Sequence, residues 1–167
     1  MQTPDIIFLF GASSSGKTTL AKALQRQLEA AYLHVPLDAF GSMFPESKLG
    51  DQELCSDAAP KLFEGFYRSI AALVGCGNKV IADTIAHEHG PQVFKPLFES
   101  FSVVYVAVKC PVEELERREL ARGDRVIGLA RSQFREVDIF LRHDIEVDTH
   151  EHNAEECATL IKEFITS

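Results

Sequence analysis

The sequence predicts a single α/β domain in which helices cover both faces of a parallel β-sheet. Two observations favour this fold. Short apolar runs alternate along the chain with longer segments of helical periodicity, and the first apolar run ends in a glycine-rich turn that opens a helix. Strands that alternate with helices pair in parallel, because each helix returns the chain to the starting edge of the sheet. The length of 167 residues suits one domain with a sizeable core.

The predicted strands are short and rich in β-branched and aromatic residues. Pro36 is expected to shorten the second of them, because proline cannot donate a ladder hydrogen bond. The strands are predicted over residues 5–10, 32–37, 79–85, 103–109 and 145–147.

The predicted helices have apolar residues three or four positions apart. Pro96 is expected to bend or break one of them. Residues 38–59 are rich in Gly, Pro, Ser and acidic residues, and are predicted to be an irregular loop; loops of that length are usually functional. Helices are predicted over residues 17–31, 60–74, 91–101, 111–122, 126–140 and 151–165.

Composition and charge exclude several classes of function. The net charge of -8 disfavours sequence-independent binding to nucleic acid, whose phosphates would repel the chain. The four cysteines form no C-x-x-C pair, which indicates reduced thiols and a cytoplasmic protein. The apolar run at residues 6–10 is too short for a signal peptide or a membrane span. We therefore expect neither a nucleic acid nor a membrane as partner. Monomer and homodimer remain open.

The turn after the first strand matches the phosphate-loop pattern G-x-x-x-x-G-K-[ST] at every defined position. The glycines let the backbone wrap a phosphate, and the following helix N-terminus favours the anion. The lysine is expected to contact the β- and γ-phosphates and the first threonine to bind Mg²⁺. No guanine-reading N-K-x-D follows Asn78, so ATP is favoured over GTP. The expected nucleotide-binding residues are Gly11, Ala12, Ser13, Ser14, Ser15, Gly16, Lys17, Thr18 and Thr19.

Two aspartates stand at the carboxyl ends of predicted strands, where ligands of open α/β sheets bind. Asp38 follows the second strand and is the candidate to orient or deprotonate an acceptor hydroxyl. Asp83 ends the third strand and is the candidate to hold Mg²⁺, directly or through water. The alternative for each is a turn or helix-capping aspartate.

Arginines are concentrated in one segment of this acidic chain. Arg118 and Arg122 are i,i+4 neighbours, Gly123 breaks the helix, and Arg125 can turn back toward the same point. Guanidinium groups there would stabilise a transferring phosphoryl group, as a kinase lid requires, and Arg122 is also a candidate nucleotide contact. The alternative is an ordinary helix bridged by Glu–Arg pairs. The acids of this helix are expected to form its solvated face: Glu113, Glu114, Glu116 and Glu119. The seven arginines are Arg117, Arg118, Arg122, Arg125, Arg131, Arg135 and Arg142.

The remaining polar clusters are interpreted more simply. The His87–His89 and His150–His152 pairs are expected to be loop histidines, because Mg²⁺ prefers oxygen ligands to imidazole. Residues 148–153 either lie beside a nucleotide base or form a turn with a helix cap.

Taken together, these motifs resemble chloramphenicol phosphotransferase and the wider group of small P-loop kinases built like nucleoside-monophosphate and shikimate kinases. The likeness covers most of the chain. It is clearest in the G-x-S-S-x-G-K loop at 11–17, in Asp38, in V-A-V-K-C from Val106, in E-R-R-E-L-A-R-G-D-R-V-I-G, and in D-I-E-V-D-T to Thr149.

The resemblance implies a three-layer α/β/α P-loop fold with a five-stranded parallel sheet, a helical lid at about 117–142 and an acceptor region at about 38–60. It also implies transfer of the ATP γ-phosphate to a small-molecule hydroxyl, possible acceptors including an antibiotic such as chloramphenicol. In this comparison Asp38 matches the general base, Lys17 the phosphate lysine, and Arg118, Arg122 and Arg125 the lid cations.

The chain departs from the family in residues 40–59 and near Asp138 and His143-Asp144, where the family tends to carry a His and a Tyr-Asp pair. These differences predict a different substrate pocket. Two alternatives to this function are a nucleotide or nucleoside kinase of the same fold and an ATP-driven switch with no small acceptor.

Overall fold

The computed structural model describes residues 3–45, 52–85, 94–122, 128–134 and 142–167, with the backbone alone at 52–56 and 122. Its centre is a five-stranded sheet in the order β2-β3-β1-β4-β5, and every neighbouring pair is parallel. The predicted parallel α/β fold is therefore confirmed. The strands are β1 (Ile6–Phe10), β2 (Tyr32–Pro36), β3 (Lys79–Thr84), β4 (Val103–Lys109) and β5 (Ile145–Asp148).

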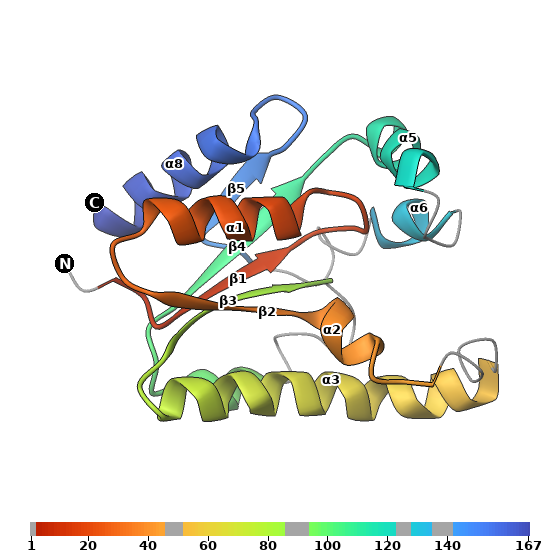
Figure 1. Cartoon of the computed structure of the whole chain (residues 1–167), viewed down its shortest axis with the longest axis horizontal. Coiled ribbons are helices and arrows are strands. Elements are labelled where there is room, and N and C mark those ends of the chain that lie inside the picture. The colour runs from red at the N-terminus through yellow and green to blue at the C-terminus, as the bar shows by residue number, and fades with distance from the viewer. Residues whose placement is uncertain (1–2, 46–51, 86–93, 123–127, 135–141) are drawn as a thin grey trace.

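The helices form the two outer layers, with α1 and α8 on one face of the sheet and α3 on the other (Figure 1). The α5 and α6 helices lie at the edge where the strands end, close to the turn between β1 and α1 (Figure 1). The helical segments are α1 (Lys17–Gln27), α2 (Leu37–Gly41), α3 (Gln52–Gly75), the 3₁₀ turn η2 (Lys95–Phe98), α5 (Val112–Arg122), α6 (Leu129–Phe134) and α8 (Ala154–Thr166).

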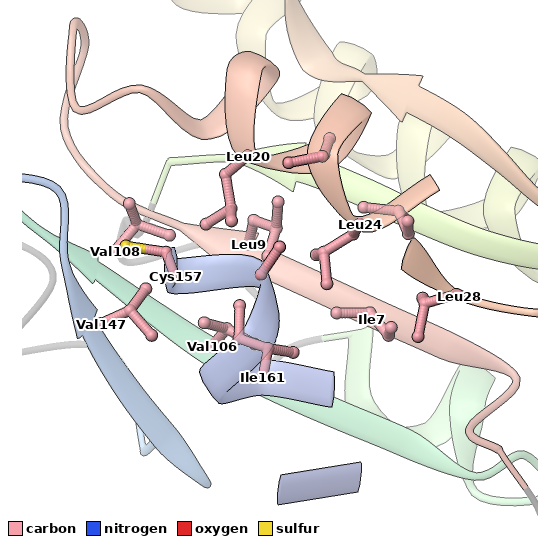
Figure 2. Packing of buried hydrophobic residues seen from close by; sticks show 14 of the residues in the cluster. Ile7, Leu9, Leu20, Leu24, Leu28, Val106, Val108, Val147, Cys157 and Ile161 are labelled. Atoms are coloured by element: carbon pink, nitrogen blue, oxygen red, sulfur yellow. The ribbon is translucent and has the colours of Figure 1, made fainter. Parts of the chain in front are cut away.

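Side chains of the fully buried β1 strand alternate between two hydrophobic clusters. Ile7 and Leu9 face the α1–α8 layer, where Leu24 and Ile161 pack against them (Figure 2). The alternate residues of β1 face the α3 layer, where the centroid of the Phe8 ring lies 5.3 Å from that of the Phe98 ring. Burial on both faces fixes the register of β1, because a slip of one residue would exchange its two sets of side chains.

The prediction of an irregular segment over 38–59 was wrong at both of its ends, while residues 46–51 lie outside the described residues. Leu37–Gly41 forms α2, and α3 begins at Gln52 rather than at Pro60. Pro60 was predicted to be the first residue of this helix, a position that suits proline. In the structure it lies inside α3, where its missing N–H leaves one backbone hydrogen bond unmade.

Other helix boundaries also differ from prediction. The helix expected over 91–101 is reduced, within the described residues, to a 3₁₀ turn with Pro96 at its start; residues 91–93 lie outside the described part. The first helix ends at Gln27, because Leu28 takes an extended conformation. The last helix starts at Ala154, where the Asn153 side chain caps it.

The segment 126–140 was predicted to be helical, and its described part contains α6. Residues 126–127 and 135–140 lie outside the described residues. Within the part of the chain that the structure describes, none of the helices combines the length and apolar character needed to cross a bilayer.

Candidate active site

The phosphate loop leaves β1 and turns tightly into α1, and both of its glycines are sterically required. A Cβ atom on Gly11 would lie 2.6 Å from the Val108 carbonyl oxygen and 2.6 Å from Ser15 Oγ. Gly16, the N-cap of α1, has φ of 88°, which disfavours any residue with a side chain. The glycine spacing of the motif thus follows from close backbone approach and from a left-handed turn.

Replacement of Gly11 by alanine is expected to destabilise the fold by about 1–3 kcal/mol, because the new methyl group overlaps strand β4. Chemical denaturation measures this loss. The control is Gly65→Ala on α3, where an added Cβ meets no atom within 4 Å. Equal stability of the two variants would contradict the steric account.

The loop presents a cation and several hydroxyls that suit an anionic ligand. Lys17 Nζ donates to the carbonyl oxygens of Gly11 (3.0 Å) and Ala12 (2.8 Å), so the ammonium group lies over the loop. The Ser13 and Ser14 hydroxyls are buried and have no hydrogen-bond partner within the described part of the chain. Buried hydroxyls without partners are costly, and phosphate oxygens are strong acceptors that would satisfy them. The loop therefore fits the phosphates of a nucleotide.

Thr18 and Asp83, the two predicted metal ligands, are in contact. Thr18 Oγ1 donates to Asp83 Oδ2 at 3.0 Å, and Asp83 is 4% exposed. A hydroxyl that donates its proton to a carboxylate keeps its oxygen lone pairs for a cation. Oxygen donors of this kind are those that Mg²⁺ prefers. The described residues include no group of three or more His, Cys, Asp or Glu side chains arranged around a common metal position.

A cavity of about 610 Å³ opens directly above the phosphate loop. Its walls come from the loop itself, from the β2–α2 junction with Asp38, from the end of β3 with Asp83, and from α6. Asp38 lies in the first turn of α2 and is exposed. The structure thus brings the predicted phosphate, metal and acceptor-side residues around one cavity of a size typical for small-molecule sites.

The α6 helix contacts the phosphate loop through a residue that sequence reasoning missed. Ser13 N donates to Gln133 Oε1 at 2.8 Å, and Gln133 also lines the cavity. The helix is held at its start by Glu119, which is 1% exposed and accepts from Gly128 N (2.7 Å) and Ala130 N (2.9 Å). The prediction that Glu119 faces solvent was wrong, because its carboxylate satisfies backbone donors at the start of α6.

Arg118 lies behind the phosphate loop, against the turn that follows β5. Its guanidinium donates to Glu114 Oε1 at 2.7 Å and to the Thr149 carbonyl oxygen at 3.0 Å. Thr149 Oγ1 in turn donates to the Ser15 carbonyl oxygen at 2.8 Å. Hydrogen bonds from Arg117 and Arg118 lower the pKa of Glu114 to about 2, so this ion-paired group stays charged at neutral pH.

The other two predicted lid cations are not placed. Arg122 ends α5, but its side chain lies outside the described residues, as does the whole of Arg125. The histidine pair at 87 and 89 falls outside them too.

The turn at 148–153 has the capped form that was one of its two predicted alternatives. Asp148 Oδ1 accepts from His150 N at 2.7 Å, and Asn153 and Glu156 form a reciprocal capping box at the start of α8. The turn therefore holds its shape through local bonds and supplies Thr149 to the rear of the phosphate loop.

Comparison with known proteins agrees with the resemblance noted from the motifs. The profile of the family described as chloramphenicol phosphotransferase-like protein matches residues 4–166. The chain belongs to this chloramphenicol phosphotransferase-like family. A Mycobacterium tuberculosis (strain ATCC 25618 / H37Rv) relative, named "Putative O-phosphotransferase Rv2636", is 32% identical over 168 residues, which cover 86% of this chain and 74% of the relative.

Solved structures show which fold this chloramphenicol phosphotransferase-like chain shares. Mycobacterium tuberculosis APS kinase CysC, in complex with AMPPNP and APS, superposes with a TM-score of 0.74 over 100% of both chains at 16% identity. Shikimate kinase from Acinetobacter baumannii, in complex with shikimate, gives a TM-score of 0.67 at 16% identity and covers 99% of this chain and 94% of that one. At such identities the likeness shows the P-loop kinase fold alone.

Proposed function

We propose that the protein transfers the γ-phosphate of ATP to a hydroxyl group of a small molecule. The observation that carries the proposal is that the phosphate loop and Asp38 line the same cavity. Membership of a kinase-like phosphotransferase family supports the same reaction class. The hydroxyls and the lysine of the phosphate loop suit a donor phosphate. The exposed Asp38 carboxylate suits an acceptor hydroxyl.

On the donor side, the loop residues bind and orient the triphosphate. The Ser13 and Ser14 hydroxyls donate to phosphate oxygens, and the Lys17 ammonium lies where it offsets their charge. Thr18 and Asp83 would hold Mg²⁺, which neutralises charge on the phosphates when bound.

On the acceptor side, Asp38 is the proposed general base. Its carboxylate accepts the proton of the acceptor hydroxyl while that oxygen bonds to the γ-phosphorus. The bond from this phosphorus to the bridging oxygen breaks, and the electron pair leaves with ADP. Residues from about 38 to 60 then form the acceptor region, in agreement with the position of α2 beside the cavity.

The lid role is assigned to Arg122 and Arg125, on the segment at about 117–142. Arg118 was expected to share that role, but its guanidinium is bound to Glu114 and Thr149 behind the loop. We therefore propose that Arg118 supports the nucleotide side of the loop, and that charge developing on the transferred group is met by the two later arginines.

The test is incubation of the protein with ATP, Mg²⁺ and a panel of hydroxyl compounds that contains chloramphenicol, nucleosides and nucleoside monophosphates. A phosphorylated alcohol, detected by mass spectrometry, is expected. Phosphorylation confined to nucleotides or nucleosides would favour the nucleoside-kinase alternative. Tight ATP binding with hydrolysis alone, across a broad panel, would instead indicate a switch and reject the proposal.

A further inference from the structure

His34 lies on the edge strand β2, and its ring reaches the carboxylate next to the phosphate loop. His34 Nε2 is 2.8 Å from Asp83 Oδ2, and the two side chains are 13% and 6% exposed. In the sheet register His34 pairs with Ile81, two positions before Asp83. Side chains two positions apart share one face of a strand, so the imidazole meets the carboxylate diagonally across the β2–β3 ladder.

Asp83 Oδ2 receives two donors at once. Thr18 Oγ1 donates to it at 3.0 Å, and the His34 ring nitrogen lies on the same oxygen. An ionised carboxylate can only accept, so Nε2 of His34 carries the hydrogen. Two converging donors from different elements, α1 and β2, fix the rotation of a carboxylate better than one. The second oxygen of Asp83 takes no part in these two bonds.

We propose that His34 is a positioning residue of the metal site, which orients Asp83 so that Thr18 and Asp83 together present oxygen atoms to Mg²⁺ bound with ATP. This rests on the proposed function. The donor network is nearly buried, and Asp83 lines the cavity above the loop. Groups that orient a metal ligand from behind typically change metal affinity 10- to 100-fold when removed.

The same contact joins the two halves of the site. β2 runs from His34 through Pro36 into α2, which carries Asp38 four residues after the histidine. The imidazole therefore links β2, the strand that leads to Asp38, to Asp83 beside the phosphate loop. A histidine that merely filled space in the sheet would have no reason to affect the metal more than the nucleotide.

The experiment measures Mn²⁺ binding by electron paramagnetic resonance in the presence of a non-hydrolysable ATP analogue. His34→Leu keeps bulk and removes the donor, and is expected to weaken Mn²⁺ binding about 10- to 100-fold. Affinity for the analogue without metal should change little. His34→Gln, which retains an N–H donor on an unbranched side chain, is expected to recover most of the loss. Gln25→Leu, which removes a side-chain donor to the Tyr32 carbonyl oxygen (2.7 Å) at the opposite end of β2, is the matched control.

Several outcomes would overturn the inference. One is Mn²⁺ affinity of His34→Leu equal to wild type. Another is a loss of metal and analogue binding in the same proportion, which indicates damage to the sheet. If His34→Leu does not fold, the comparison passes to His34→Gln and His34→Asn, and equal Mn²⁺ affinity of the shorter amide and the longer one would reject the role. Wild-type protein that binds no Mn²⁺ with the analogue would reject the proposed function itself.

Discussion

Asp38→Asn is expected to lower the rate of phosphoryl transfer by a factor of about 10²–10⁴, the usual effect of removing a general base. Asparagine keeps the size of the side chain but cannot accept the hydroxyl proton. Because Asp38 lines the cavity from the β2–α2 junction and is not part of the phosphate loop, the affinity for ATP should remain close to that of the parent protein. Single-turnover rates with the best acceptor of the panel measure the first effect, and calorimetry the second.

Glu163→Gln provides the control, since that residue is an exposed acid on α8, in the layer on the opposite face of the sheet from α3. It should leave the transfer rate unchanged. An Asp38→Asn variant with full activity would remove Asp38 from the role of base, while leaving the assignment of the phosphate loop intact.

Lys17→Met is expected to lower the transfer rate by a factor of about 10²–10³, the loss typical of one group that stabilises developing charge. Methionine retains most of the length of the lysine side chain without its charge. The ammonium lies over the loop through its bonds to Gly11 and Ala12, so its removal leaves the phosphate oxygens without the nearby cation. Affinity for ATP should fall as well, because the charge acts before and during transfer.

Lys22→Met on the same helix is the control, because Lys22 is exposed and is not one of the residues that line the cavity. Its expected effect on both rate and affinity is negligible. If the two lysine variants bound ATP equally well, the loop would not be the triphosphate site and the proposed donor side would have to be abandoned.

The fold could be predicted from the sequence because its signals are local. The apolar runs that became β1 and β4 are short and bounded by turn residues, and the glycine spacing at Gly11 and Gly16 reports a backbone constraint that the structure shows directly. The clustering of Lys17, Thr18, Asp38 and Asp83 followed from one rule, that parallel strands deliver their carboxyl ends to a common edge.

The missed residues share a different property. His34 meets Asp83 across 49 positions of sequence, and Gln133 meets Ser13 across 120. Such contacts depend on how side chains are directed after the sheet and helices have packed, and no local period reports them. Glu119 was misjudged for the same reason, because an acid among Glu–Arg pairs gives no sign that a later helix will cover it.

The region of α2 and the first turns of α3 was wrongly predicted to be a loop, because its Gly, Pro and Ser content is typical of loops. Gly, Pro and Ser between two elements usually indicate a loop, yet α3 continues through Pro60. Helix formation in proteins draws most of its stability from packing, and the later turns of α3, which contain Phe66 and Tyr67, are buried against the sheet.

That helix has a consequence for how the protein can change. Its 24 residues span about 36 Å, and its first turns extend past the end of the sheet (Figure 1). Among its residues with described side chains, the first buried one is Phe66. The helix thus combines a buried stretch from Phe66 onward with an earlier stretch that carries exposed side chains. Exposed positions before Phe66, such as Lys61 and Glu64, can change without altering the buried core, so under the proposed function the preferred acceptor could change while the donor chemistry is inherited unaltered.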